Sequence, residues 1–150
     1  MVWLRTLRGL KVIRDGKCLG RVVQGCLCDT LTALDGFWLD RAIAGMRFLS
    51  AEHICVLGHH SIVVDYPGER LRMKPQPLML RAVSTDGKRL GAIIDAGIDE
   101  RTLAVEELAL TPGWAEGLMH GLIRIRNFKC DLANARVIVP RDEGETEVFL

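Results

Sequence analysis

The chain has 150 residues, of which 49% are hydrophobic and 26% are charged. This composition is typical of a globular protein and argues against global disorder, and the length fits one average domain or two small ones. The formal net charge is only +1 and aromatic residues make up 5% of the chain. A nucleic-acid partner is therefore disfavoured, because it requires a basic surplus or several aromatic side chains for stacking.

The charge is distributed unevenly along the chain. Residues 1–75 contain 11 Lys and Arg and 7 Asp and Glu, which gives +4, whereas residues 76–150 contain 9 and 12, which gives −3. The two values sum to the net charge of +1. Opposite charges favour packing between the halves or between copies of the chain, so the sequence leaves a homo-oligomer open.

The cysteines indicate a reducing compartment. The chain has an odd number of them, at Cys18, Cys26, Cys28, Cys55 and Cys130. Arginines interrupt the N-terminal residues where a secretory signal would be apolar, and no run approaches the roughly 18 apolar residues that a membrane span needs. We therefore expect a cytoplasmic protein with free thiols and without a transmembrane segment.

A six-residue motif occurs twice, 71 residues apart. Its first copy is Asp-Gly-Lys-Cys-Leu-Gly at 15–20, and its second is Asp-Gly-Lys-Arg-Leu-Gly at 86–91. Each copy lies between two β-prone runs, and an Asp-Gly pair in this position is a strong hairpin signal because the tight turn needs positive φ. The repeat predicts two related units, each with a hairpin at this motif.

The strand that follows each hairpin alternates with a period of two. In the second copy we expect one face to point into the core: Leu90, Ala92, Ile94, Ala96 and Ile98. The corresponding face of the first copy consists of Leu19, Arg21, Val23, Gly25 and Leu27. Asp95 and Asp99 lie on the opposite face, which we expect to be solvated.

Short strands also account for the rest of each half. We expect strands at 34–42, 45–49 and 61–64 in the first half and at 102–110, 121–126 and 136–139 in the second. Between the strands at 45–49 and 61–64, Ser50 is placed to begin a helical turn that ends by Gly58. A final strand at 148–150 is left open.

The prolines at 67, 75 and 77 mark a linker between the halves, since proline does not donate to a sheet ladder. We place the boundary near residue 74, which gives units at 1–74 and 75–150. The predicted fold is all-β: two tandem, small, mostly antiparallel β-barrels with at most short helical turns.

Several of these segments resemble the PRC-barrel domain family. The resemblance rests on 9–22 and 49–64 in the first half and on 87–95 in the second, while 133–139 keeps the final strand without the helical turn. This family includes a domain of the H subunit of photosynthetic reaction centres and of a bacterial ribosome maturation factor. The resemblance implies a small barrel that acts as an adaptor or docking module, and it supplies no catalytic residues and no cofactor.

Four residues of the first half are weak candidates for metal ligands: His53, Cys55, His59 and His60. Histidine and thiolate side chains bind zinc well, but this spacing matches no compact zinc signature. The favoured interpretation is a turn with one packed cysteine and solvated histidines. Cys26 and Cys28 lie two apart on a strand, which gives no Cys-x-x-Cys redox motif. They could face the other half or a partner, but the favoured interpretation is that they are small apolar fillers.

Three residues of the second half are candidates for partner binding. Trp114 lies in a Pro-Gly-Trp loop, where an exposed aromatic side chain would be an anchor for a partner. Arg124 and Arg126 share a strand face and could contact phosphate or an acidic partner. Trp38, in contrast, follows Phe37 in an apolar strand and is expected in the core.

These observations favour a non-enzymatic adaptor that binds another protein or a macromolecular assembly, without a cofactor. Two alternatives from other classes remain. One is a metal- or thiol-dependent regulatory protein that uses Cys55 and the nearby histidines. The other is an enzyme or small-molecule site in a cleft between the two barrels.

Overall fold

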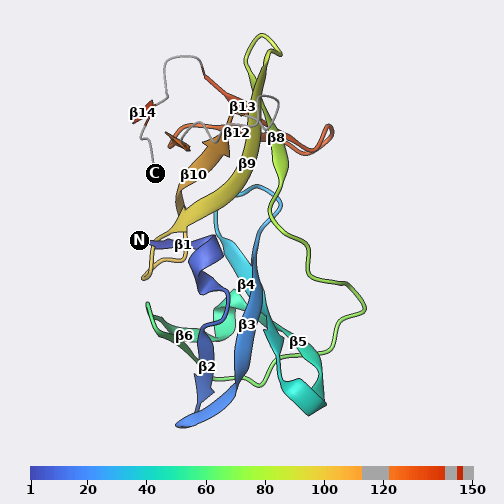
Figure 1. The fold of residues 1–150 in the computed structure, drawn as a ribbon, viewed down its shortest axis with the longest axis vertical. Helices are drawn as coiled ribbons and strands as arrows, with labels where there is room; N and C mark the ends of the chain where they lie inside the picture. Colours follow the sequence, from blue (N-terminus) through green and yellow to red (C-terminus); the bar gives the residue numbers. More distant parts are fainter. Residues whose placement is uncertain (113–121, 141–144, 147–150) are drawn as a thin grey trace. The chain divides into compact units, whose positions relative to one another are not determined.

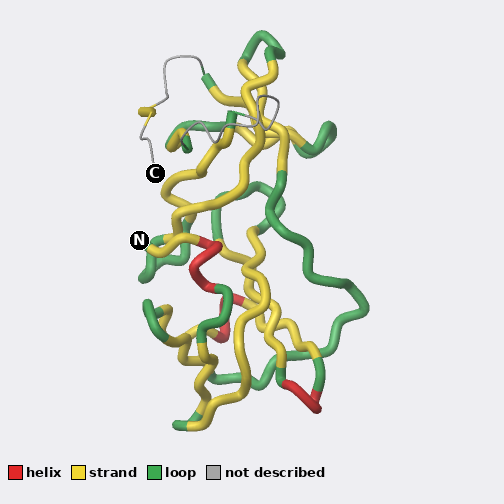
Figure 2. Tube along the Cα trace, viewed as in Figure 1, coloured by secondary structure: helices red, strands yellow, loops and turns green. Residues whose placement is uncertain are grey.

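The computed structural model describes residues 1–112, 122–140 and 145–146, and within them the protein is all-β (Figure 2). The helical elements there are three single turns of 3-10 helix: η1 (Leu4–Leu7), η2 (Ala42–Ala44) and η3 (Ala51–His53). The strands form two curled sheets. The predicted all-β class with short helical turns is therefore confirmed.

The chain divides into two compact units, which we describe separately. The first unit comprises Met1–Pro77 and Ile98–Val105, and the second comprises Leu78–Gly97 and Glu106–Leu150. Residues 98–105 thus belong to the first unit, although in the chain they lie between the two segments of the second unit.

The sheet of the first unit has six strands (Figure 1), namely β2 (Lys11–Arg14), β3 (Lys17–Leu27), β4 (Leu34–Asp40), β5 (Met46–Ser50), β6 (Ile54–Leu57) and β7 (Ser61–Val64). Their order in space is β5-β4-β3-β2-β7-β6. The β2–β7 pair is parallel, and the other neighbours are antiparallel. A further short strand, β1 (Val2–Trp3), precedes η1.

The other sheet is built from β8 (Leu80–Ser84), β9 (Arg89–Ile98), β10 (Val105–Thr111), β11 (Ile123–Ile125), β12 (Lys129–Asp131), β13 (Arg136–Val139) and β14 (Glu145–Thr146). Its path is β12-β13-β8-β9-β10-β11-β14. Apart from β14, this is the strand order of the first sheet read from its other end, and again the pair of the first and last strands, β8 and β13, is parallel.

Both predicted Asp-Gly hairpins are confirmed. In the first, Asp15 (φ 51°) and Gly16 (φ 75°) form a two-residue turn between the paired residues Arg14 and Lys17. Two successive positive φ values match the right-handed twist of the flanking strands. The second hairpin joins β8 to β9 through a longer turn in which Gly87 has a φ of 84°.

The predicted inward face of β3 and of the first half of β9 is wrong. In β3 the buried side chains are Val22 and Gln24, while Arg21 is exposed. In β9, Ile93 is fully buried and Ile94 is only half-buried, whereas Ala96 and Ile98 are fully buried as predicted. Both faces of this strand carry isoleucine, so the alternation alone did not distinguish the buried face from the open one.

One glycine on this buried face recurs in both units. A Cβ atom on Gly20 would collide with the backbone carbonyl oxygen of Asp40, and a Cβ atom on Gly91 would collide with that of Thr111. Both glycines and both carbonyls are separated by the 71-residue offset of the repeat. The absence of a side chain therefore lets the adjacent strand pass close by at the same place in each sheet.

Each unit has its own hydrophobic core. Fully buried side chains of the first unit are Leu4, Leu7, Val12, Phe37, Leu39, Leu49 and Ile62. Those of the second unit include Ile93, Leu108, Leu110, Ile125 and Val137. Trp38 is buried as predicted, and its ring packs edge-on against Phe48 with the centroids 5.3 Å apart.

Strands are present in all six of the ranges predicted outside the hairpins, but β1, β12 and β14 were not predicted, and residues 50–58 also differ from the prediction. The predicted helical turn is present as η3, but the Ser50 side chain makes no capping hydrogen bond. The residues after it form strand β6, which pairs with β7 and was not predicted. The open question of a strand at 148–150 lies outside the described residues.

Candidate functional site

Two of the four predicted metal candidates, His53 and His59, contact separate carboxylates. His53 Nδ1 lies 3.0 Å from Asp65 Oδ1, and the His53 ring stacks on Tyr66 with the centroids 4.6 Å apart. This contact ties η3 to the residue that follows β7. Cys55, on the edge strand β6, is exposed.

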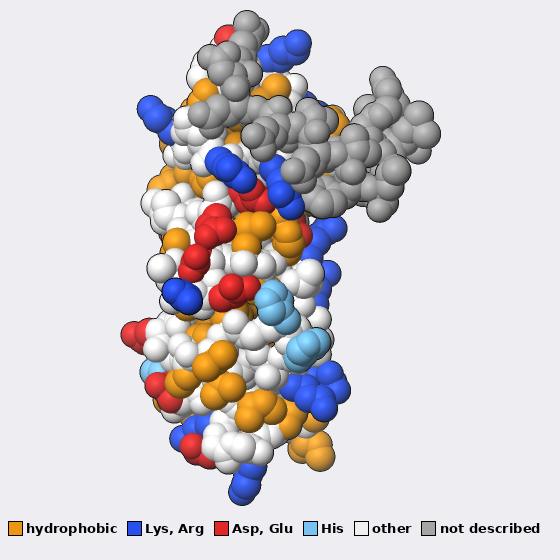
Figure 3. All heavy atoms as spheres, turned by 90° about the vertical axis from the view of Figure 1, so that its left-hand side faces the viewer, with side chains coloured by type: hydrophobic (Ala, Val, Ile, Leu, Met, Phe, Trp, Pro, Cys, Tyr) orange, Lys and Arg blue, Asp and Glu red, His pale blue; other side chains and the backbone are white. Residues whose placement is uncertain are grey.

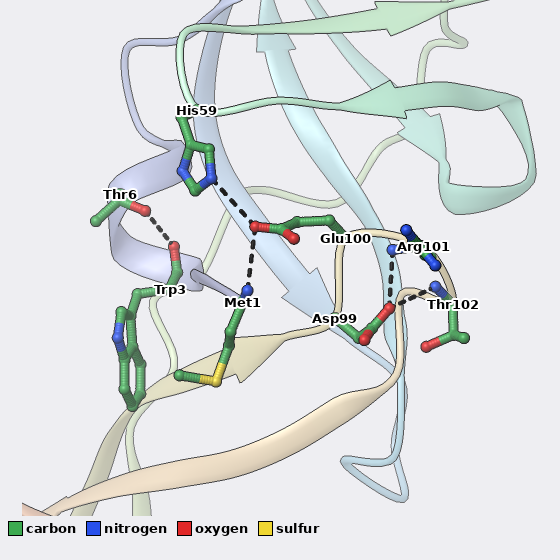
Figure 4. A network of polar contacts seen from close by, with 8 residues as sticks. All are labelled: Met1, Trp3, Thr6, His59, Asp99, Glu100, Arg101 and Thr102. Atoms are coloured by element: carbon green, nitrogen blue, oxygen red, sulfur yellow. Dashed lines mark hydrogen bonds and ion pairs between the residues drawn. The ribbon is translucent and has the colours of Figure 1, made fainter.

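His59 belongs to a different cluster (Figure 4). Its Nε2 atom lies 3.2 Å from Oε1 of Glu100, which is also 3.1 Å from the N-terminal ammonium group of Met1. On the face drawn in Figure 3, histidine side chains lie beside acidic ones. Within residues 1–112, 122–140 and 145–146, no three His, Cys, Asp or Glu side chains are grouped to hold a metal ion.

The pKa values of two neighbouring thiols, Cys26 and Cys28, are shifted in opposite directions. Burial and the negative charge of Asp35 raise the pKa of Cys26 to about 11. At Cys28 burial also raises the pKa, but hydrogen bonds with the Thr30 and Thr32 hydroxyls and with backbone groups outweigh it and lower the pKa to about 7. Both Oγ1 atoms lie 3.4 Å from Cys28 Sγ. The interpretation of Cys28 as an apolar filler is therefore wrong, because its surroundings stabilise the thiolate.

Asp95 and Asp99 have structural roles. Asp95 is only 9% exposed, which contradicts the predicted solvated face, and its Oδ1 accepts a hydrogen bond from the Ala96 backbone N–H. Asp99 Oδ1 accepts hydrogen bonds from the backbone N–H groups of Arg101 and Thr102, each at 2.8 Å. Asp99 thus shapes the turn between β9 and β10.

Arg124 and Arg126 are drawn together by a buried carboxylate that the sequence reasoning missed. Glu107 on β10 is 2% exposed, and its two oxygens lie 3.3 Å from Arg124 Nε and 3.4 Å from Arg126 Nε. The Arg126 side chain is 71% exposed. One glutamate therefore offsets one of the two guanidinium charges. The third partner-binding candidate, Trp114, lies outside the described residues.

The most unusual surface in the described part of the chain is the tip of the β4–β5 hairpin in the first unit (Figure 1). The turn closes with a hydrogen bond from the Arg41 N–H to the Gly45 carbonyl, at 3.0 Å. Asp40 Oδ1 accepts a hydrogen bond from the Ala42 N–H, at 2.9 Å. Ala42 (φ 54°) and Gly45 (φ 83°) both adopt positive φ. These features give the turn a defined conformation.

This turn presents an isoleucine to solvent. The relative exposure of Ile43 is 106%, so its side chain packs against nothing in the structure. Met46, on the first position of β5, is also exposed. Two alanines flank Ile43, and their small side chains leave it as the outermost apolar group of the turn.

Arginines lie beside this turn and on the segment that pairs with β5. The segment after β7 runs beside β5, where the backbones of Phe48 and Glu69 exchange two hydrogen bonds of 2.8 Å. This pairing brings Arg70 close to Arg47. Partial desolvation, followed by the positive charges of Arg70 and Arg41, lowers the pKa of Arg47. The positive charges of Arg41 and Arg70 are therefore close enough to act on Arg47.

The basic and apolar pattern continues along the chain after Arg70. Residues 70–74 read Arg-Leu-Arg-Met-Lys and are all exposed. We use the name tip surface for residues 41–47 together with 70–74. These twelve residues contain five basic and no acidic side chains. They hold four of the nine large hydrophobic side chains that are exposed among the described residues, namely Ile43, Met46, Leu71 and Met73.

The sequence reasoning missed the tip surface, although a signal was present. Isoleucine is unusual in a tight turn, because β-branched residues favour strands and turns favour Gly, Pro, Asn, Asp and Ser. The predicted strand ended at Ala42, and the next strand began at Gly45, so Ile43 already lay in the turn.

No helix in the described part of the chain has the length and hydrophobicity to span a membrane. Comparison with known proteins finds no family model that matches the chain and no match among curated proteins.

Proposed function

We propose that this protein is a non-enzymatic docking protein, which binds a negatively charged macromolecular partner through the tip surface. The observation that carries the proposal is the full exposure of Ile43 on a turn between Arg41 and Arg47, whose charge interacts with that of Arg70. Ile43, Met46, Leu71 and Met73 are exposed on two segments that pair at Phe48 and Glu69, and exposed apolar groups that gather with a polar rim are typical of interaction sites.

The energetics of the tip surface support this proposal. Transfer of one isoleucine side chain from water to an apolar environment contributes about 1.5–3 kcal/mol, which the isolated protein does not gain. The mutual repulsion of Arg41, Arg47 and Arg70 is relieved when an acidic partner supplies opposite charge. Both contributions therefore favour the bound state.

We further propose that the two units are copies of one ancestral unit and that this unit is related to the PRC-barrel domain. The shared strand order and the matching positions of Gly20 and Gly91 support the duplication. The resemblance itself rests on the sequence segments given above. An adaptor role accords with that family and with a cytoplasmic location, which the five free cysteines support.

Quantitative co-purification from the native cell tests the docking function. The full-length protein would be compared with Ile43→Asp, which places a negative charge on the turn between Arg41 and Arg47, and with Leu132→Asp as a control. Leu132 is an exposed apolar residue of the second unit, between β12 and β13. We expect a reproducible partner, protein or lipid, that Ile43→Asp loses and Leu132→Asp retains. A set of co-purified molecules that is the same for all three proteins would contradict the proposal.

A further inference from the structure

We infer that the negatively charged partner of the tip surface is the anionic face of a lipid bilayer. This inference rests on the proposed docking function and specifies its partner. It is carried by three features of the tip surface: the protruding position of Ile43 on a hairpin turn, the excess of five basic residues over the two adjoining acidic ones, Asp40 and Glu69, and the kinds of apolar side chain present.

The shape of the tip favours a deformable partner. Ile43 stands at the outermost point of a hairpin turn and is exposed on all sides. A folded protein that binds such a point needs a pocket of matching shape, because shape complementarity decides how much water is excluded. A bilayer needs no preformed pocket, since its lipids rearrange around an inserted side chain. The short, defined turn between Arg41 and Gly45 would hold the isoleucine in the inserting position.

The charge of the tip surface matches an anionic bilayer. Its five basic residues are Arg41, Arg47, Arg70, Arg72 and Lys74. Each Lys or Arg near an anionic membrane increases the affinity by about fivefold at physiological salt. The alternation of basic and apolar residues in 70–74 also suits an interface, because long basic side chains keep their charge at the headgroups while their stems contact apolar groups.

The kinds of apolar side chain in the tip surface also favour a bilayer. Energetic hot spots between proteins are enriched in Trp, Tyr and Arg. The tip surface has arginines but neither aromatic residue, and its exposed apolar side chains are isoleucine, leucine and methionine. The nearest aromatic residue in the hairpin, Phe48, packs against Trp38 within the first unit. Aliphatic side chains of this kind gain free energy when they enter an apolar layer, and they need no pocket of matching shape.

Vesicle co-sedimentation of the full-length protein tests the inference. The probes are vesicles of phosphatidylcholine alone and vesicles containing about one third phosphatidylglycerol, at about 0.1 M salt, where electrostatic attraction still acts over several ångströms. We expect binding only to the anionic vesicles, with a marked loss at about 0.5 M salt.

Two tip variants separate the apolar and the electrostatic contributions. Ile43→Ser removes the inserted side chain and should weaken vesicle binding by about tenfold. Arg70→Gln combined with Arg72→Gln should weaken it by about 25-fold. Both arginines are exposed and lie outside the hairpin, so this second variant does not depend on the folding of the turn.

Matched controls remove the same groups from other surfaces. Leu132→Ser removes an exposed apolar side chain, and Lys17→Gln combined with Arg89→Gln removes two exposed positive charges. Both controls should bind anionic vesicles as the wild-type protein does. Equal losses in the tip variants and the controls would overturn the inference, because binding would then depend on overall charge alone.

A fluorescent oligoglutamate peptide serves as the probe for an acidic protein partner. Binding of this peptide that depends on the tip surface, without binding to anionic vesicles, would overturn the bilayer inference and retain the docking function. Absence of binding to both probes would also overturn the bilayer inference. The docking function would fall with it only if Ile43→Asp left the co-purified molecules unchanged.

Discussion

The two units share a scaffold and differ in the chemistry placed on it. Their sheets have the same strand order, and a glycine at equivalent positions, Gly20 and Gly91, admits a neighbouring carbonyl in each. At other equivalent positions the residues diverge. Position 36 of the first unit is glycine, whereas position 107 of the second is the buried glutamate that contacts Arg124.

Two further pairs show the same divergence. Gln24 is buried and accepts a hydrogen bond from Arg8 Nε at 3.2 Å, whereas its counterpart Asp95 accepts one from the backbone. Cys28 and its counterpart Asp99 both donate their backbone N–H across the turn, to Ala33 and Ala104 respectively, but one carries a thiol and the other a carboxylate. The backbone requirements are thus met by glycines and turns, while side chains at the same sites are free to change.

The largest loss of unfolding free energy is expected at the two equivalent glycines, Gly20 and Gly91. Gly20→Ala and Gly91→Ala each place a Cβ atom against a backbone carbonyl, so the strands must separate. We expect each to lower the free energy of unfolding by about 3 kcal/mol or more, measured by urea denaturation with circular dichroism.

Gly16→Ala is the control for this pair. Gly16 has a positive φ of 75° but open space where a Cβ atom would lie. Its replacement should cost only about 1–2 kcal/mol, from backbone strain alone. A loss for Gly91→Ala no larger than that for Gly16→Ala would contradict a shared close approach of the strands.

The next largest loss of stability is expected at the buried Glu107 of the second unit. Glu107→Ala leaves the half-buried Arg124 guanidinium without its nearby carboxylate, which should cost about 2–3 kcal/mol of unfolding free energy. Arg126→Ala should cost less than about 1 kcal/mol, since the Arg126 side chain is 71% exposed. Equal losses for the two variants, in the same denaturation assay, would argue against the central role of the buried carboxylate.

In the first unit, thiol reactivity should distinguish Cys28, in the turn after β3, from Cys26. The alkylation rate of Cys28 with iodoacetamide should reach half of its maximum near pH 7, because the thiolate is the nucleophile, whereas Cys26 should react only toward pH 11. Since the folded pKa of Cys28 lies below its ordinary value of 9.0, the folded state gains stability as pH rises from about 7 to about 9.

Removal of both hydroxyls tests the cause of this acidity. Thr30→Val combined with Thr32→Val should move the midpoint of Cys28 alkylation toward the ordinary thiol value, as followed by mass spectrometry of the alkylated peptide. A midpoint that remains near 7 would assign the lowered pKa to the backbone hydrogen bonds instead.

The smallest effect on stability is expected at the tip surface. Ile43→Ser changes a side chain that packs against nothing, so the free energy of unfolding should change by less than about 0.5 kcal/mol. A loss above about 1 kcal/mol would show that Ile43 contributes to the fold and would remove the basis for its docking role.

The sequence predicted the features that depend on local chemistry. The Asp-Gly pairs produced hairpins because each turn needs a residue with positive φ, which Gly16 and Gly87 provide, and strands such as Ser61–Val64 and Arg136–Val139 followed from their β-branched residues. It failed where the answer depends on tertiary packing. The buried face of β9 depends on which neighbour approaches Gly91, and the carboxylate of Asp95 is buried because a backbone N–H satisfies it.

The candidate site was harder to predict for the same reason. Arg47 and Arg70 are distant in the sequence and become neighbours only because Glu69 pairs with Phe48. The residues singled out from the sequence were those with distinctive chemistry, such as His53 and His59, and the fold directs these two toward different carboxylates. Periodicity and composition contain no information on such pairings.

Site-specific photo-crosslinking from position 43 tests the docking role of the tip surface most directly. A benzophenone amino acid would replace Ile43 in the full-length protein, with the same replacement at Leu132 as the reference, and crosslinked products would be analysed in the native cell for both lipids and proteins. The tip surface predicts a dominant product from position 43 that is absent at position 132, and the bilayer inference predicts that it is an anionic lipid. Identical products from both positions, or no product from position 43, would contradict a docking role for this hairpin.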